Sequence, residues 1–193
     1  MKRIVFTTFL MFTFCFAAFA QKLEEKNEAI SPAGLKTKIK GFNGKTFHLA
    51  DSKAKCTVVL LWASWSNPGS LAFKDFGKIN AEFNKNGIKI FGLSVDEKKR
   101  DQKRAKYFAR KLKIKFDSGF ADRDLLRSFE LTSIPTIWLL SPNGEILNKI
   151  IGYNRVTTIV ELKKQLNEEF STNLKIPVTK NKKSSELIIS GKH

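Results

Sequence analysis

The chain has 193 residues and a formal net charge of +17, and 42% of its residues are hydrophobic. This length and apolar content are enough for one ordinary domain with its own core, and they exclude a wholly disordered chain. Cys15 and Cys56 are its two cysteines. Cys15 lies in the N-terminal segment described next, so an internal disulfide is excluded once that segment is removed.

The first 20 residues have the pattern of a secretory signal peptide. Residues 1–3 are basic at two positions, residues 4–20 are apolar apart from three threonines, and the segment ends in small residues at Ala18 and Ala20. We predict cleavage after Ala20 and a location in the periplasm or cell envelope. An uncleaved anchor is the alternative, although the apolar run is slightly shorter than the roughly 20 residues that span a bilayer.

The rest of the chain divides into three parts by composition. Residues 21–33 are polar and mixed in charge, and we expect a flexible lead-in there. Residues 34–170 contain the regular apolar patterns of one domain, and residues 171–193 form a basic tail that we expect to be disordered.

A β-hairpin is predicted at the start of the domain, on the edge of the sheet. Asn43-Gly44 separates the weakly alternating run Leu35–Lys40 from Thr46–Leu49, and Asn-Gly between such runs is a strong hairpin signal. His48 falls on the second strand, where we expect a surface or half-buried histidine and not a catalytic one.

The stretch from Cys56 to Ser70 predicts a buried strand, a loop and a helix start. Val58–Trp62 is continuously apolar, as in a strand covered by helices on both faces, and Pro68 is favoured in a first helical turn. The loop between them therefore lies at the positive end of a helix dipole, where thiolates and anions are stabilised. Many enzymes place a reactive cysteine there, and this chain has Ser66.

The remaining elements alternate between helices and strands. In chain order we predict a helix from Pro68 to Asn86, a strand over Ile88–Val95, a helix opening at Asp96 and Glu97, an extended piece over Ile114–Asp117, a short helix over Asp122–Phe129 capped by Asp122, a strand after Pro135 up to Leu140, a turn at Ser141–Gly144, a strand over Glu145–Ile151 and a helix over Val156–Phe170. This order indicates an α/β fold with parallel strands joined by crossovers and an antiparallel edge.

Two motifs carry a resemblance to a known family. The stretch Val58–Gly69 resembles the active-site segment of exported thioredoxin-like proteins of the TlpA/ResA type, in which the loop reads Trp-Ala-Ser-Trp-Cys-Pro-Pro-Cys. Ser133–Thr136 is similar to the cis-proline motif that faces this loop in the family. The resemblance extends from about Leu35 to Phe170. It implies a thioredoxin-like fold, with a central mixed sheet flanked by helices and an N-terminal β-hairpin.

The chain departs from the family at the redox chemistry. Ser66 and Gly69 stand at the two cysteine positions, and a serine hydroxyl cannot attack or form a disulfide as a thiolate does. Leu60 stands where thioredoxins have a buried acid, and no histidine is near in sequence to activate Ser66. Cys56 is predicted at the opposite end of the sheet, as a small buried hydrophobe. We interpret Ser66 as a helix N-cap.

We therefore expect a redox-inactive protein with no cofactor and no metal. The alternative is a thiol-disulfide oxidoreductase or antioxidant protein of the usual family type, which would depend on a thiol from a partner. A peroxiredoxin would need a cysteine in the loop with threonine and arginine support, which the sequence does not show.

The resemblance also implies a binding groove for extended peptides. We expect an extended peptide or an envelope protein as the partner, and an inert scaffold is the alternative. The predicted groove residues are Trp65, Ser66, Asn67, Pro68, Gly69, Ser133, Ile134 and Pro135.

Basic residues crowd one predicted helix and its exit. We expect anionic lipid headgroups or acidic envelope polymers as possible partners and no nucleic acid, and a merely solvated helix face is the alternative. A purely structural protein that attaches to a surface through this helix is a third functional class. The cations are Lys98, Lys99, Arg100, Lys103, Arg104, Lys106, Arg110, Lys111, Lys113 and Lys115.

Overall fold

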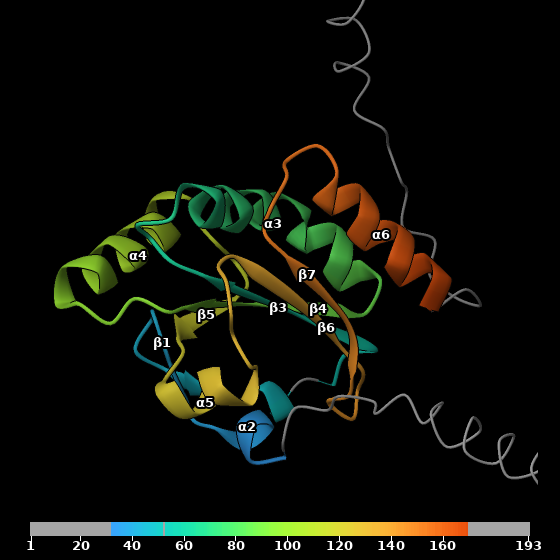
Figure 1. Ribbon diagram of the computed structural model, residues 1–193, viewed down its shortest axis with the longest axis horizontal. Helices are drawn as coiled ribbons and strands as arrows, with labels where there is room; N and C mark the ends of the chain where they lie inside the picture. The colour runs from blue at the N-terminus through green and yellow to red at the C-terminus, as the bar shows by residue number, and fades with distance from the viewer. Residues whose placement is uncertain (1–31, 52, 170–193) are drawn as a thin grey trace, which may run out of the picture.

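A computed structural model describes residues 32–51 and 53–169 of the chain. In these residues one mixed sheet has the strand order β2-β1-β5-β4-β3-β6-β7. Figure 1 shows α3, α4 and α6 on one face of this sheet and α2 and α5 on the other. The elements are α2 (Pro32–Lys36), β1 (Ile39–Gly41), β2 (Thr46–Phe47), a 3-10 turn (Leu49–Asp51), β3 (Cys56–Trp62), α3 (Asn67–Lys85), β4 (Ile88–Ser94), α4 (Lys99–Lys111), β5 (Asp117–Phe120), α5 (Arg123–Ser128), β6 (Thr136–Leu140), β7 (Ile146–Ile151) and α6 (Thr158–Glu169). The predicted fold class is confirmed.

Strand β3 lies inside the sheet, between β4 and β6, and separates two apolar cores. All seven of its residues are buried. Val58, Leu60 and Trp62 join the core that contains the phenylalanines of α3, while Val59 and Leu61 join the core on the α5 face. The continuous apolar run is explained by this burial on both faces. Its pairing is parallel to β4 and antiparallel to β6, as predicted.

Helix α3 begins and ends close to the predicted positions. Asn67 is its first residue and Pro68 lies in its first turn, while Phe73, Phe76 and Phe83 are buried. Gly87, just beyond the end of the helix, has φ of +77°, a left-handed conformation that glycine adopts without a steric penalty.

The N-terminal hairpin is present, but its first strand is shorter than predicted. Residues 35 and 36 belong to α2, because Pro32 opens a short helix there. Strand β1 begins only at Ile39, and β2 comprises two residues before the chain enters a 3-10 turn. His48 therefore follows the strand instead of lying on it, and it is half-buried.

Two predictions in the middle of the chain are wrong. Asp96 and Glu97 do not open the second helix, because α4 begins at Lys99 and Asp96 is buried in a polar network described below. The extended piece predicted at Ile114 belongs to the exit of α4, where its backbone N–H donates to the carbonyl of Ala109 at 3.0 Å. Strand β5 follows instead over Asp117–Phe120.

The C-terminal half follows the predicted order. Asp122 caps α5, accepting a hydrogen bond from the N–H of Leu125 at 2.8 Å, and β6 and β7 form an antiparallel hairpin. Helix α6 starts two residues after Val156, because Asn154 accepts hydrogen bonds from the two N–H groups that precede the helix.

Several predictions lie outside the described residues. These are the signal peptide over residues 1–20 with its cleavage site, the lead-in up to residue 31, the end of the last helix at Phe170, and the tail over residues 171–193. In the part of the chain that the structure does describe, no helix combines the length and the apolar character needed to cross a membrane.

Candidate functional site

Ser66 caps helix α3 with its side chain. Its Oγ accepts a hydrogen bond from the backbone N–H of Gly69 at 3.2 Å, and its backbone is extended, with φ of −88° and ψ of 120°. The predicted N-cap role is confirmed. The hydroxyl thus satisfies one of the amide groups that a helix start leaves without an intrahelical partner.

Gly69 lies against the capping residue. A Cβ built on Gly69 would lie 3.2 Å from both Cβ and Oγ of Ser66, and 3.3 Å from the backbone nitrogen of Ala63. These separations are closer than ordinary van der Waals contact. The missing side chain is therefore what allows the first helical turn to lie so near to the loop.

The cis-proline segment lies beside this loop. The Ile134–Pro135 peptide bond is cis, as the resemblance implied. In the antiparallel ladder Leu61 is paired with Thr136, so the residues just before β6 are adjacent to the residues just after β3. The structure thus brings together residues 65–69 and 133–135, which we call the loop surface.

The loop surface exposes a large aromatic ring. Trp65 is 58% exposed, although its neighbours Trp62 and Ala63 are fully buried. Asn67, Pro68 and Ser133 are exposed as well, whereas Ile134 is half-buried and Pro135 and Gly69 are buried. The predicted site residues therefore differ in accessibility. Trp65 offers the largest accessible apolar area. Gly69 and Pro135 are buried, and they contribute to the site through the conformation of the backbone.

A buried polar network holds the loop from behind. The carboxylate of Asp96 accepts hydrogen bonds from the backbone N–H of Ser64 at 3.0 Å and from the hydroxyl of Ser94 at 2.7 Å. The hydroxyl of Ser64 in turn donates to the carbonyl of Asp101 at 3.1 Å. All four residues are at least nine-tenths buried. This network was not predicted from the sequence. The one sequence feature that could have indicated it is an aspartate two residues after a buried strand.

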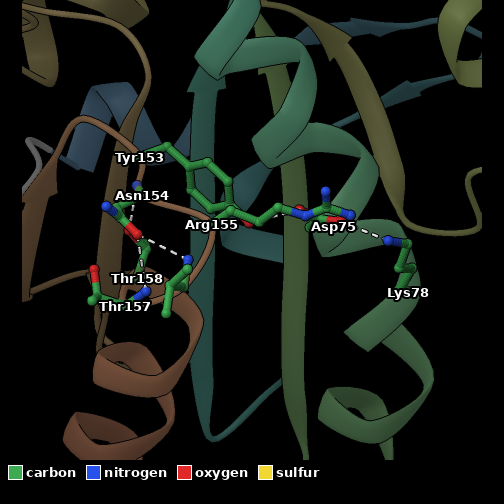
Figure 2. A network of polar contacts seen from close by, with 8 residues as sticks. Asp75, Lys78, Tyr153, Asn154, Arg155, Thr157 and Thr158 are labelled. Atoms are coloured by element: carbon green, nitrogen blue, oxygen red, sulfur yellow. Dashed lines mark hydrogen bonds and ion pairs between the residues drawn. The ribbon is translucent and has the colours of Figure 1, made fainter. Parts of the chain in front are cut away.

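The segment between β7 and α6 also lies next to the site. The backbone N–H of Gly152 donates to the carbonyl of Pro135 at 2.8 Å, which joins this segment to the cis-proline. Figure 2 shows the next residues reaching toward α3. There Tyr153 donates its hydroxyl to the carboxylate of Asp75 at 3.0 Å, and Arg155 pairs with the same carboxylate at 3.4 Å.

Asp75 is the centre of this second network. It lies on α3, is almost completely buried, and also pairs with Lys78 at 2.8 Å. Burial, together with the negative charge of Asp75 and the hydrogen bond to it, raises the pKa of Tyr153 above its ordinary value near 10. Tyr153 therefore remains a protonated donor at neutral pH. Neither residue was predicted from the sequence to belong to the site.

Three described residues, Cys56, Leu60 and His48, could be considered as substitutes for the redox groups of the family, and none of them places such a group near Ser66. Cys56 is fully buried and is paired with Ile88 at the first position of β3, six residues before the end of that strand. At about 3.3 Å per residue this places it roughly 20 Å from the loop. Leu60 is buried in an apolar core. His48 follows β2, which is four strand positions from β3, or roughly 19 Å at the usual strand spacing.

The site contains hydrogen-bond donors, acceptors and an aromatic ring, and residues 65–69 themselves contain no thiol, carboxylate or imidazole. Within residues 32–51 and 53–169, no three histidine, cysteine, aspartate or glutamate side chains gather into a group that could hold a metal ion.

The comparisons with known proteins agree with this fold. Residues 14–149 match the model of the AhpC/TSA family. The chain is 25% identical over 111 residues to the thiol-disulfide oxidoreductase ResA of Bacillus subtilis and 24% identical over 110 residues to ResA of Bacillus cereus. These matches cover 57% and 56% of this chain. The chain spans only 60% and 62% of the length of those two relatives.

Solved structures share the same architecture. The crystal structure of a putative thiol:disulfide interchange protein DsbE from Chlorobium tepidum matches with a TM-score of 0.60 and 22% identity, over 68% of this chain and 91% of that one. StoA from Bacillus subtilis matches with a TM-score of 0.57 and 21% identity, over 67% of this chain and 95% of that one. At these identities the likeness establishes the thioredoxin-like fold alone. Together with the family match over residues 14–149, it shows that this chain is a thioredoxin-like member of the AhpC/TSA family.

Proposed function

We propose that this protein does not exchange disulfides and that it binds an extended peptide or a partner protein through its loop surface. The observation that carries the proposal is the role of Ser66. The residue at the position of the family's nucleophilic cysteine is a helix cap whose Oγ accepts a hydrogen bond from Gly69. Thiol-disulfide exchange requires a thiolate that attacks and a second thiol that resolves the mixed disulfide, and neither position supplies one.

The accessible groups of the loop surface support a binding role. Trp65 exposes 58% of its surface beside the cis-proline segment, and aromatic residues of this kind are frequent anchors at interfaces. Within the described part of the chain, the backbone N–H and C=O of Ile134 have no hydrogen-bond partner. An extended peptide that lies along residues 133–135 would satisfy both groups, as a strand added to a sheet edge does.

We place the protein in the periplasm or cell envelope, after cleavage of its signal peptide. The basic, apolar and small-residue pattern of residues 1–20 supports this location. A further solved structure with the same fold is described as a secreted disulfide oxidoreductase of Mycobacterium tuberculosis, and it matches with a TM-score of 0.59. The partner would then be an envelope protein or one of its extended segments.

The alternative is a thiol-disulfide oxidoreductase or antioxidant protein of the usual family type. The activity named for the ResA relatives favours it. Because the loop lacks both cysteines, this alternative requires a protein thiol from a partner. Insulin reduction by dithiothreitol tests whether the isolated protein exchanges disulfides by itself. We expect no rate above dithiothreitol alone, whereas turnover by the isolated protein would overturn the proposal.

Peptide binding is tested by backbone chemical shifts of the isotope-labelled protein. A library of extended peptides should shift amide signals of residues 65–69 and 133–135, and Trp65→Ala should weaken that binding at least tenfold. Tyr107→Ala is the matched control, since Tyr107 is 50% exposed but lies on α4. Unchanged shifts across the library, or equal losses in the two variants, would rule out binding at the loop surface.

A further inference from the structure

Helix α4 exposes an almost uniformly cationic face. Eight of its side chains are exposed, and seven of them are lysine or arginine. The eighth is Tyr107. We call these residues the basic face. Its cations are Lys99, Arg100, Lys103, Arg104, Lys106, Arg110 and Lys111.

Within the described part of the chain, Arg100 is the only one of these cations with an ion-pair partner. Asp101 is the single acidic residue of α4, and it is buried, with its carboxylate accepting from Arg100 at 3.3 Å. Like charges recur four residues apart, for example at Lys99 and Lys103 and at Lys106 and Arg110. Such pairs destabilise a helix, whereas an ordinary solvated face interleaves charges of both signs. The basic face thus opposes the stability of α4, which is the behaviour expected of a surface kept for an anionic partner.

Two features distinguish the partner from a purely hydrophilic polyanion. Tyr107 lies among the cations, with Lys111 Nζ at 5.7 Å and Arg110 Cζ at 6.0 Å from its ring centroid. An amphipathic ring surrounded by lysine and arginine is the combination found where proteins meet the headgroup region of a bilayer.

The second feature is a cavity between α4 and the N-terminal hairpin, with a volume of about 450 Å³. Its apolar walls include Phe42, Phe47 and Phe116, and Lys106 and Arg110 of the basic face also line it. Asp117 on its wall is already paired with Lys89 at 2.9 Å. Apolar walls beside cations fit an amphiphile with an anionic head.

We propose that the basic face binds a bilayer surface that contains anionic phospholipid, with α4 lying along the membrane. The 13 residues of α4 span about 20 Å, enough to present all seven cations to one surface. The attraction is electrostatic and must weaken as salt shortens the screening length. This interaction uses other residues than the loop surface, and it is independent of the proposed function.

The test is co-sedimentation of the full chain with vesicles of phosphatidylglycerol and phosphatidylcholine, against phosphatidylcholine alone. The basic-face variant is Lys103→Gln/Arg104→Gln/Lys111→Gln. The matched control, Lys36→Gln/Lys53→Gln/Lys164→Gln, removes the same charge from exposed positions elsewhere. Both keep the same N-terminal segment, so any contribution of that segment cancels. Circular dichroism checks that both are folded.

We expect the basic-face variant to bind anionic vesicles about 100-fold more weakly. It removes three surface cations, and the estimate sums the usual contribution of each of them to membrane binding. The control should lose less than about threefold, because its cations lie outside the basic face and long-range attraction is screened. Equal losses in the two variants, or no preference of the unmodified chain for anionic vesicles, would overturn the proposal.

A second comparison separates a bilayer from a soluble polyanion. Tyr107→Ala should weaken vesicle binding several-fold and leave binding to polyphosphate unchanged, because only the bilayer offers an interface for the ring. An unchanged vesicle affinity, with polyphosphate bound as tightly as the vesicles, would replace the lipid proposal with a polyanion site.

Discussion

Restoring the two thiols tests whether the loop lacks only its cysteines. In the variant Ser66→Cys/Gly69→Cys, the new side chains start from Cβ positions that are 3.2 Å apart. Disulfides have Cβ separations of about 3.5–4.5 Å, with a mean near 3.8 Å. The loop must therefore open by only a few tenths of an ångström, and we expect the disulfide to form under mild oxidation with loss of two protons and two electrons to the oxidant.

The stability of this variant can be estimated from opposing effects. Loss of the Ser66 cap costs about 1 kcal/mol, and replacing a helical glycine by cysteine returns a few tenths. Closing a loop of four residues stabilises the oxidised form by about 2 kcal/mol in the chain-entropy model, less whatever strain the short Cβ separation imposes. We expect the oxidised variant to be within about 1 kcal/mol of the unmodified protein, and the reduced variant to be the least stable of the three.

Three measurements check this expectation. Thiol titration and mass spectrometry follow the disulfide, urea denaturation gives the free energies of unfolding, and insulin reduction reports exchange activity. A thiol at residue 66 would lie at the start of α3, where the helix dipole lowers its pKa below the ordinary value of cysteine and favours the reactive thiolate. A folded variant that forms the disulfide but reduces no insulin would show that more than the thiols has been lost. Activity in the unmodified protein would refute the reasoning itself.

Three further substitutions follow from the networks around the site. Asp96→Ala should lower the free energy of unfolding in urea by about 3 kcal/mol, because it leaves the buried donors of Ser64 and Ser94 without an acceptor. Tyr153→Phe should lower it by about 1–2 kcal/mol at pH 7, since one hydrogen bond to a charged group is lost. Trp65→Ala should change it by less than about 0.5 kcal/mol, because the ring is largely exposed.

The effect of Tyr153 should also depend on pH. Its folded-state pKa is raised above the unfolded value near 10, so its stabilising contribution is complete below pH 10 and is lost as the pH rises toward the folded-state pKa. The difference between the unmodified protein and Tyr153→Phe should therefore shrink between pH 9 and pH 11. A difference that stayed constant or grew would contradict the sign of this linkage.

The exposed Asp124→Ala, expected to change stability by less than about 0.5 kcal/mol, is the control for Asp96→Ala.

Local patterns in the sequence determined the central part of the fold. The apolar run before Trp62, proline in the first turn of α3 and the serine just before it together predicted a buried strand, a loop and a capped helix, and the structure confirms each. These features depend on the periodicity of buried residues and on backbone groups only a few residues away. Both can be read directly from the local sequence. The absence of cysteine at residues 66 and 69 was visible in the same way.

Tertiary structure decided the contacts that support the loop surface. Asp96 and Ser64 are 32 residues apart, and Tyr153 and Asp75 are 78 apart. No local pattern distinguishes a carboxylate that caps a helix from one that accepts hydrogen bonds from a distant loop. Asp96 was therefore predicted to open α4, and the structure places it behind Ser64 instead. Strand register and helix packing bring such groups together, because buried donors must find acceptors wherever the folded chain places them.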